Sequence, residues 1–141
     1  MAVFSELRFL VVDDMLTMRN IVMKNLQNLG ATQISLANNG IAAWDMLEKT
    51  AALRKPIDFV ISDWNMPEMS GIDLLLRCRN SSDYKNVAFL LVTAESEVVQ
   101  VREAISAGVD NYVVKPFTPA AFQAKVNAIL GKRFPTAKAG K

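Results

Sequence analysis

The sequence predicts an α/β fold in which a doubly wound, five-stranded parallel sheet is covered by helices on both faces. Two observations lead to this prediction. Five short apolar segments recur along the chain, and a segment with apolar side chains at helical spacing follows each of them. The apolar segments lack the polar alternation of strands that have one face in water, so both of their faces should be buried between layers of helices.

The first two strand–helix units lie in the first third of the chain. The first strand is the run 7–12, which is apolar except for Arg8. Apolar side chains then recur three and four residues apart, which predicts a helix that ends before Gly30. The second strand, at 34–37, and the helix at 41–49 repeat this order.

The other three units follow the same pattern. The third strand, at 59–62, is followed by a polar loop and by a helix whose apolar stripe begins at Ile72. Gly108 is placed to end the helix of the fourth unit. The last two strands are predicted at 87–92 and 112–114, and the last two helices at 97–107 and 119–130.

Composition and charge exclude several classes of protein. Of the 141 residues, 51% are hydrophobic, which is enough to bury a core without disulfides, and we expect one domain over 1–131. Four basic and no acidic residues lie in 132–141, which we expect to be a disordered tail. The rest of the chain has 12 basic and 14 acidic residues, so it presents no basic surface for nucleic acid or for a membrane.

The sequence also predicts a location and limits the chemistry. No apolar run approaches the roughly 20 residues of a membrane span, and no export signal precedes the first strand. The single cysteine, Cys78, has no partner for an internal disulfide, so we expect a cytoplasmic monomer. There is no histidine, and any acid, base or metal chemistry must therefore come from carboxylates.

Polar residues stand at the carboxyl ends of the predicted strands. The first strand ends in Asp13 and Asp14, the third in Asp63, the fourth in Thr93 and the fifth in Lys115. Ligands of open parallel sheets bind at these strand ends. We therefore expect three carboxylates, a hydroxyl and an ammonium group to converge on one edge of the sheet.

These residue types suit a magnesium ion and a phosphoryl group. Three crowded carboxylates repel one another unless a cation binds, and all-oxygen ligands favour a hard ion such as Mg²⁺. Lys115 and Thr93 could bind phosphoryl oxygens, and Asp63, central in the sheet, is the candidate nucleophile for an aspartyl phosphate. The sequence has no glycine-rich nucleotide loop, so the phosphoryl group must come from an outside donor.

Four motifs, in this order and spacing, resemble the response-regulator receiver family, and in particular its single-domain chemotaxis members, across nearly the whole chain. The resemblance implies the flavodoxin-like strand order and phosphorylation of Asp63 by a histidine kinase of the CheA type or by a small acyl phosphate. It implies no turnover of a separate substrate. The motifs are LVVDD at 10–14, SDWNMP at 62–67, VTAE at 92–95 and YVVKPF at 112–117.

The resemblance also implies roles for single residues. Asp13, Asp14, Asp63 and the backbone carbonyl of Asn65 would bind Mg²⁺, and Lys115 would pair with the phosphoryl group and precede a cis peptide bond to Pro116. Thr93 and Tyr112 would form the switch, because phosphorylation would favour one of two arrangements of their side chains. Asn65 and Glu95 would tune how long the phosphoryl group survives.

The output face implied by the resemblance lies on the last two helices and the last strand. Chemotaxis relatives carry lysines at the positions of Val98 and Ala128 that help to bind the flagellar switch protein FliM, whereas Lys125 is retained. The partner could be FliM or another protein helix or peptide, and a phosphatase could act on the phosphorylated form. The residues expected on this face are Val98, Val101, Tyr112, Val114, Phe117 and Lys125.

Other functions remain open at this point. The chain could be a phosphate sink that drains a shared kinase and binds no motor protein. A magnesium-dependent phosphohydrolase of the haloacid-dehalogenase type also forms an aspartyl phosphate, but such enzymes carry D-x-D after the first strand, where this chain has Asp13-Asp14-Met15. A flavodoxin-like electron carrier would have hydroxyls and glycine in that loop instead of two acids.

Three single residues allow two interpretations each. Tyr112 could be a static, half-buried ring rather than a switch. Trp64 could pack at the surface or could report on neighbouring Asp63 through its fluorescence. Cys78, which lies between two arginines, is expected to be a packing residue rather than a redox centre.

Overall fold

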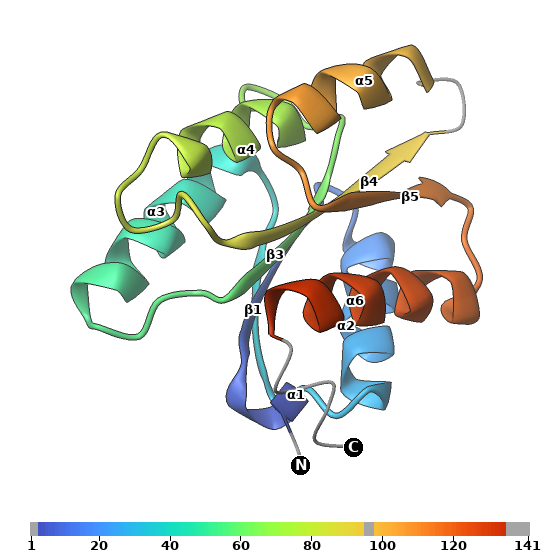
Figure 1. Ribbon diagram of the computed structural model, residues 1–141, viewed down its shortest axis with the longest axis horizontal. Helices are drawn as coiled ribbons and strands as arrows, with labels where there is room; N and C mark the ends of the chain where they lie inside the picture. The colour runs from blue at the N-terminus through green and yellow to red at the C-terminus, as the bar shows by residue number, and fades with distance from the viewer. Residues whose placement is uncertain (1–2, 95–97, 135–141) are drawn as a thin grey trace.

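A five-stranded parallel sheet forms the centre of the protein (Figure 1). The structure is a computed structural model of the chain and describes residues 3–94 and 98–134. The strands lie in the order β2-β1-β3-β4-β5, which is the flavodoxin-like order, and every neighbouring pair is parallel. The strands are β1 (Arg8–Val12), β2 (Gln33–Ala37), β3 (Phe59–Asp63), β4 (Ala88–Ala94) and β5 (Asn111–Lys115).

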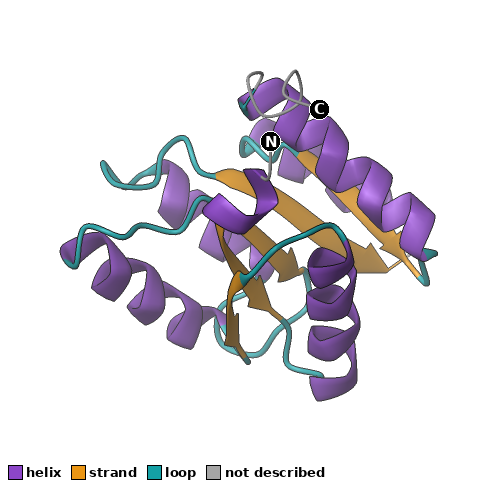
Figure 2. Cartoon of the chain, turned by 90° about the horizontal axis from the view of Figure 1, so that it is seen from below, coloured by secondary structure: helices purple, strands orange, loops and turns teal. Residues whose placement is uncertain are grey.

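Helices cover both faces of the sheet, and the predicted fold class is confirmed (Figure 2). On one face, side chains of α3, α4 and α5 form a core with Leu10, Val60 and Phe89. On the other face, α2 and α6 pack against Phe9 and Phe59, with α1 at the edge of this core. The helices are α1 (Val3–Glu6), α2 (Leu16–Asn28), α3 (Gly40–Ala52), α4 (Gly71–Arg79), α5 (Val98–Ser106) and α6 (Pro119–Arg133).

The central strand, β3, is buried along its whole length and ends in Asp63. Alternate residues of β3 point into the two cores, so Phe59 and Ile61 pack on one face while Val60 packs on the other. This burial explains the uninterrupted apolar run in the sequence. None of the helices in residues 3–94 and 98–134 is both long and apolar enough to cross a membrane.

The structure differs from the sequence prediction at both ends of the chain. Helix α1 was not predicted, because its single turn is too short to show helical periodicity. The predicted tail begins too early: Lys132 and Arg133 belong to α6, and Phe134 packs against the core. The guanidinium of Arg133 explains the longer helix, because its Nε donates to Asp110 Oδ1 at 2.6 Å and its Nη1 to the carbonyl of Asn86 at 2.8 Å. The rest of the predicted tail lies outside the described residues.

Asp110 joins several elements at the amino-terminal end of β5. Its carboxylate accepts hydrogen bonds from Arg133, from the backbone N–H of Phe89 at 2.8 Å and from Arg79 Nη2 at 3.4 Å. Arg79 also donates to the carbonyls of Gly108 and Val87. This network ties α4 and α6 to the start of the sheet, at the end opposite the strand termini that carry the polar residues.

Two of the residues with alternative interpretations lie in the core. Trp64 is 4% exposed and packs in the core under α3 and α4, so surface packing is the wrong interpretation of this residue. Cys78 is fully buried in the same core, and burial raises the pKa of its thiol to about 12, as expected for a packing residue.

Close backbone packing brings α4 against the end of β3. The N–H of Gly71 donates to the carbonyl of Trp64 at 2.9 Å, and a Cβ at Gly71 would overlap the backbone carbonyl oxygen of Asp63. Only glycine allows this approach. The capping box of Ser70 and Asp73 then begins the helix at this point, so the loop that carries Asn65 is held at both ends.

We predict that Gly71→Ala lowers the free energy of unfolding by about 2 to 3 kcal/mol, because the added methyl group meets backbone atoms that cannot rearrange without moving β3. Urea unfolding followed by circular dichroism measures the change. Gly131→Ala, in helix α6, is the control and should leave stability unchanged or raise it by roughly 0.5 to 1 kcal/mol through helix propensity. Equal stability of Gly71→Ala and the wild type would contradict the prediction.

Candidate functional site

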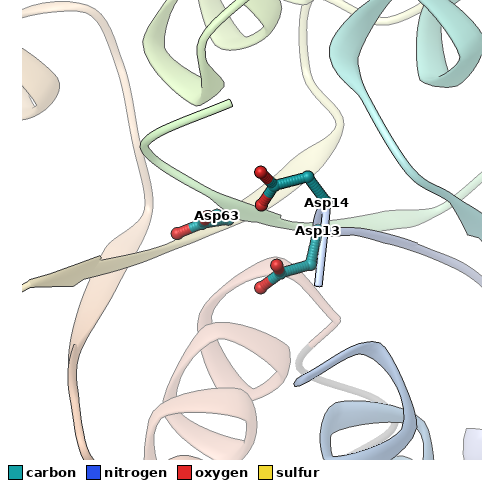
Figure 3. A group of neighbouring side chains, drawn as sticks. All are labelled: Asp13, Asp14 and Asp63. Carbon is teal, nitrogen blue, oxygen red and sulfur yellow. The ribbon is translucent and has the colours of Figure 1, made fainter. Parts of the chain in front are cut away.

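Three carboxylates meet at the carboxyl ends of β1 and β3. Asp13 and Asp14 directly follow β1, and Asp63 is the last residue of β3. The two strands are neighbours with Val12 opposite Ser62, so Asp13 and Asp63 emerge side by side. One carboxylate oxygen from each of the three residues lies within 4.8 Å of the others (Figure 3). The chain reverses its winding direction between β1 and β3, which is where flavodoxin-like sheets bind their ligands.

The backbone and side chain of Asp13 are held by several hydrogen bonds. Its N–H donates to the carbonyl of Ala37 at 3.1 Å, and its Oδ1 accepts from the N–H of Met15 at 2.9 Å. The carbonyl of Asp13 accepts from Arg19 Nη1 at 2.8 Å. Asp13 is only 2% exposed, whereas Asp14 is exposed to solvent. The two acids are therefore adjacent in sequence but differ in environment.

Lys115 supplies positive charge to the cluster. It is the last residue of β5, at the edge of the sheet, and its side chain reaches past the end of β4 to the central strand. Its Nζ lies 3.0 Å from Asp63 Oδ1 and 3.9 Å from Asp13 Oδ2. The peptide bond from Lys115 to Pro116 is cis, as the family resemblance implied.

Burial opposes the ionisation of two of the three acids. Burial raises the pKa of Asp13 from 3.8 to about 6, against the hydrogen bond from the N–H of Met15, and the nearby carboxylate of Asp63 raises it further. The pKa of Asp63, which is 6% exposed, is also raised by burial, and Lys115 counteracts this rise. One ammonium group faces three carboxylates, so the site has an excess of negative charge when all three are ionised.

This donor set fits a hard divalent cation. The carboxylate oxygens are hard ligands that lie close enough to share one ion, and a cation would oppose the burial and the repulsion from Asp63 that raise the pKa of Asp13. Histidine and cysteine, which softer metals prefer, are absent from the cluster. The three acids could therefore hold a metal ion. Asn65, whose carbonyl the resemblance implied as a further ligand, is exposed in the loop after β3.

Thr93 lies next to this cluster at the end of β4, and Tyr112 lies near the start of β5, opposite Leu91. Thr93 is buried one residue beyond Val92, which pairs with Asp63 in the sheet register, and its Oγ1 donates to the carbonyl of Ala94 at 3.3 Å. Tyr112 is half-buried, and Lys125 Nζ lies 5.2 Å from the centre of its ring. A half-buried ring is compatible with both interpretations of Tyr112, the static one and the switch.

The structure corrects one residue of the predicted output face. Val101 is 8% exposed and belongs to the inner side of α5, as does Ala104, whereas Ile105 on the same helix is 60% exposed. Excess branched residues on a helix indicate an exposed position but do not say which residue occupies it. Val114 and Lys125 are partly exposed, and Phe117 is partly buried against the ring of Phe122. The side chain of Val98 and all of Glu95 lie outside the described part of the chain.

Sequence reasoning missed Arg19. This residue lies in the first turn of α2, where the positive end of the helix dipole disfavours a cation. The sequence did contain a signal for this residue, because a basic residue stands near the start of the predicted helix, six positions after Asp13. The structure shows what compensates for this position, since the guanidinium donates to the carbonyl of Asp13.

Comparison with known proteins shows which proteins this chain is similar to. The response regulator receiver domain model matches residues 9–127. The chain is 40% identical to chemotaxis protein CheY1 of Helicobacter pylori over 125 residues, which cover 89% of this chain and 98% of that protein. It is 43% identical to chemotaxis protein CheY-3 of Vibrio cholerae over 88% of this chain and 92% of that protein. The solved structure of Vibrio cholerae chemotaxis protein CheY4 superposes with a TM-score of 0.75 at 31% identity, covering 88% and 98% of the two chains.

The raised pKa of Asp13 predicts a stability change for Asp13→Asn in metal-free protein. Between pH 4 and pH 6, roughly the interval from 3.8 to about 6, folded Asp13 binds more protons than unfolded Asp13, so wild-type stability falls as the pH rises through this window. Asparagine avoids this penalty and can still accept from the N–H of Met15. We expect the variant to be more stable than the wild type by about 1 to 3 kcal/mol above pH 6.

Urea unfolding in EDTA at pH 7.5 and at pH 4 tests this expectation. The stability difference should be largest at pH 7.5 and should shrink at pH 4. Asp45→Asn, which removes an exposed acid on α3, is the matched control and should change stability by less than about 0.5 kcal/mol. A less stable Asp13→Asn at pH 7.5 would show that the ionised carboxylate stabilises the fold.

Proposed function

Because this chain belongs to the response regulator receiver family, we propose that it is a phosphorylation-dependent switch of a two-component system in which Asp63 accepts a phosphoryl group from a histidine kinase. The observation that supports this most is the position of the Asp63 carboxylate, which lies 3.0 Å from Lys115 Nζ and beside Asp13 and Asp14. The curated relatives are chemotaxis proteins, and we infer the same process for this chain, with a kinase of the CheA type as donor.

The chain's own residues suit phosphoryl transfer. In the proposed step, a carboxylate oxygen of Asp63 forms a bond to phosphorus while the bond from phosphorus to the donor's imidazole nitrogen breaks, and that nitrogen keeps the electron pair. Lys115, now paired with Asp63 Oδ1, would then hold a phosphoryl oxygen. Thr93, buried at the neighbouring strand end, could donate to another oxygen.

We propose Mg²⁺ as the cation at this site. Asp13, Asp14, Asp63 and the backbone carbonyl of Asn65 would hold it, and it would neutralise charge on the phosphoryl oxygens during transfer. In the proposed reaction the phosphoryl acceptor is the protein's own Asp63, which later loses the group slowly as phosphate, so we expect no general phosphatase activity. This separates it from a phosphohydrolase, which would turn over free phosphate esters.

The proposed output is a change in protein binding on α5, β5 and α6. Phosphorylation would draw Thr93 toward the phosphoryl group, and Tyr112 would follow, which shifts the population of two arrangements. Tyr112, Val114, Lys125 and the exposed Ile105 are the candidates for contacts with a protein helix or peptide. The partner would be FliM or another protein in the cytoplasm, or the chain would act as a phosphate sink that touches no motor.

Intact-protein mass spectrometry after incubation with acetyl phosphate tests the phosphorylation. We expect the wild type to gain one phosphoryl group in the presence of Mg²⁺ and none in EDTA, because the acids repel the donor when no cation is bound. Asp63→Asn should gain none. Asp45→Asn, which removes an exposed acid on α3, is the control and should be modified like the wild type.

A phosphoryl group that persists in Asp63→Asn would mean that another residue is the nucleophile. Absence of modification in the wild type, with donor confirmed active on another receiver domain, would refute the proposed reaction. Hydrolysis of a generic phosphate ester at many turnovers would instead favour the phosphohydrolase.

Amide spectra of ¹⁵N-labelled protein test the switch. We expect acetyl phosphate with Mg²⁺ to shift the backbone resonances of α5, β5 and α6 more than those of α3, and Asp63→Asn to show none of these shifts. A titration of both forms with a FliM peptide then separates the two outputs: tighter binding to the phosphorylated form supports motor control, and no binding to either form supports a phosphate sink. Unchanged resonances along β5 would refute the proposed output face.

A further inference from the structure

Arg19 lies where the local electrostatics oppose a positive charge. It is in the first turn of α2, whose N-cap, Met15, provides no side-chain hydrogen bond and whose first turn contains no acid. The positive end of the helix dipole therefore faces a guanidinium instead of an anion. The structure shows a specific contact that offsets this unfavourable position, a hydrogen bond from the Arg19 side chain to the loop of the candidate site.

That contact is the hydrogen bond from Arg19 Nη1 to the carbonyl of Asp13, at 2.8 Å. The carbonyl is part of the peptide group that joins Asp13 to Asp14, so the guanidinium fixes the plane of this peptide. The N–H of Asp13 is already held by Ala37, and its carboxylate by Met15. Arg19 thus completes the set of bonds that fix Asp13 between β1 and α2.

The peptide plane matters most for Asp14. The Asp13 side chain is buried and is held by its own hydrogen bond, whereas the Asp14 side chain is exposed and lacks a surrounding core. The direction in which its carboxylate projects therefore depends on the backbone from which it extends. Mg²⁺ requires ligands close to octahedral positions, so a rotated peptide would misplace one of its three carboxylates.

We infer that Arg19 is a positioning residue for the metal site, which holds the Asp13–Asp14 peptide in the orientation that Mg²⁺ needs. This inference rests on the proposed function. The hydrogen bond of Arg19 is to the backbone of Asp13 and not to a carboxylate, so Arg19 would act on the ion through that backbone. Partners that orient metal ligands in this way commonly account for a tenfold or larger part of the metal affinity.

Electrostatics and positioning predict opposite effects for the loss of Arg19. A guanidinium next to a cation site repels the cation, so removing its charge should tighten Mg²⁺ binding if charge alone mattered. Removing the hydrogen bond should instead weaken binding, because Asp14 is no longer oriented. The sign of the change therefore decides between the two.

Isothermal titration of purified full-length protein with MgCl₂ measures this sign. We expect Arg19→Met to weaken Mg²⁺ binding about tenfold. Arg102→Met, which removes the same charge from an exposed position on α5, is the matched control and should bind Mg²⁺ within about twofold of the wild type. Fluorescence of buried Trp64, next to Asp63, gives an independent readout of the same titration.

Equal or tighter Mg²⁺ binding by Arg19→Met would overturn the inference. If Arg19→Met does not fold in metal-free buffer, Arg19→Gln takes its place, since it also removes the charge and is too short to reach the carbonyl. Weaker Mg²⁺ binding by this variant supports the inference, and equal or tighter binding overturns it. Failure of the proposed function is distinct, because then the wild type itself binds no Mg²⁺ and Asp63 is not phosphorylated, and both proposals fall.

Discussion

The ion pair between Lys115 and Asp63 is the interaction on which the candidate site depends. It joins the edge strand β5 to the central strand β3 across the end of β4, at a distance of 3.0 Å from Nζ to Oδ1. Without this ammonium group, the buried carboxylate of Asp63 would have no opposite charge close to it among the ion pairs of the described residues. Burial without such a partner favours the neutral form of an acid, and a neutral acid is a poor nucleophile and a poor metal ligand.

The site is a local source of instability that the rest of the fold must offset. Burial and neighbouring carboxylates raise the pKa of Asp13 and Asp63, so each ionised acid reduces the stability of the metal-free protein. The two apolar cores on either side of the sheet supply the stabilisation, with fully buried aromatic rings at Phe9, Phe59 and Phe89. Such electrostatic destabilisation is typical of functional sites, where the arrangement of side chains that a ligand needs reduces the stability of the protein without the ligand.

The balance of positive and negative charge differs between the two ends of the sheet. At the amino-terminal end, Asp110 is surrounded by Arg79, Arg133 and a backbone N–H, so its charge is balanced and ties helices to strands. At the carboxyl end, negative charge exceeds positive charge, and the excess is what would attract a cation. The balanced network ties α4 and α6 to the sheet, whereas the unbalanced cluster is suited to bind a cation.

The sequence by itself determined the α/β class, the order of the elements and the set of polar residues at the strand ends. It could do so because uninterrupted apolar runs and the 3.6-residue periodicity of helices are local patterns, and because parallel strands bring their carboxyl ends to one edge. Motif spacing also indicated the family and the strand order. Boundaries were less accurate: the single turn of α1 is too short to show periodicity, and the last turn of α6 depends on the contact of Arg133 with distant Asp110.

Only the tertiary structure decided which side chains meet. The reach of Lys115 past β4 to Asp63, the bond from Arg19 to the Asp13 carbonyl and the burial of Val101 depend on strand register and on the rotation of each helix about its axis. Composition and spacing carry little information about these quantities, since a rotation of a helix about its axis by one residue, about 100°, changes which of its side chains face the core. The residues of the site could thus be named from the sequence, but the interactions that hold them required the packed fold.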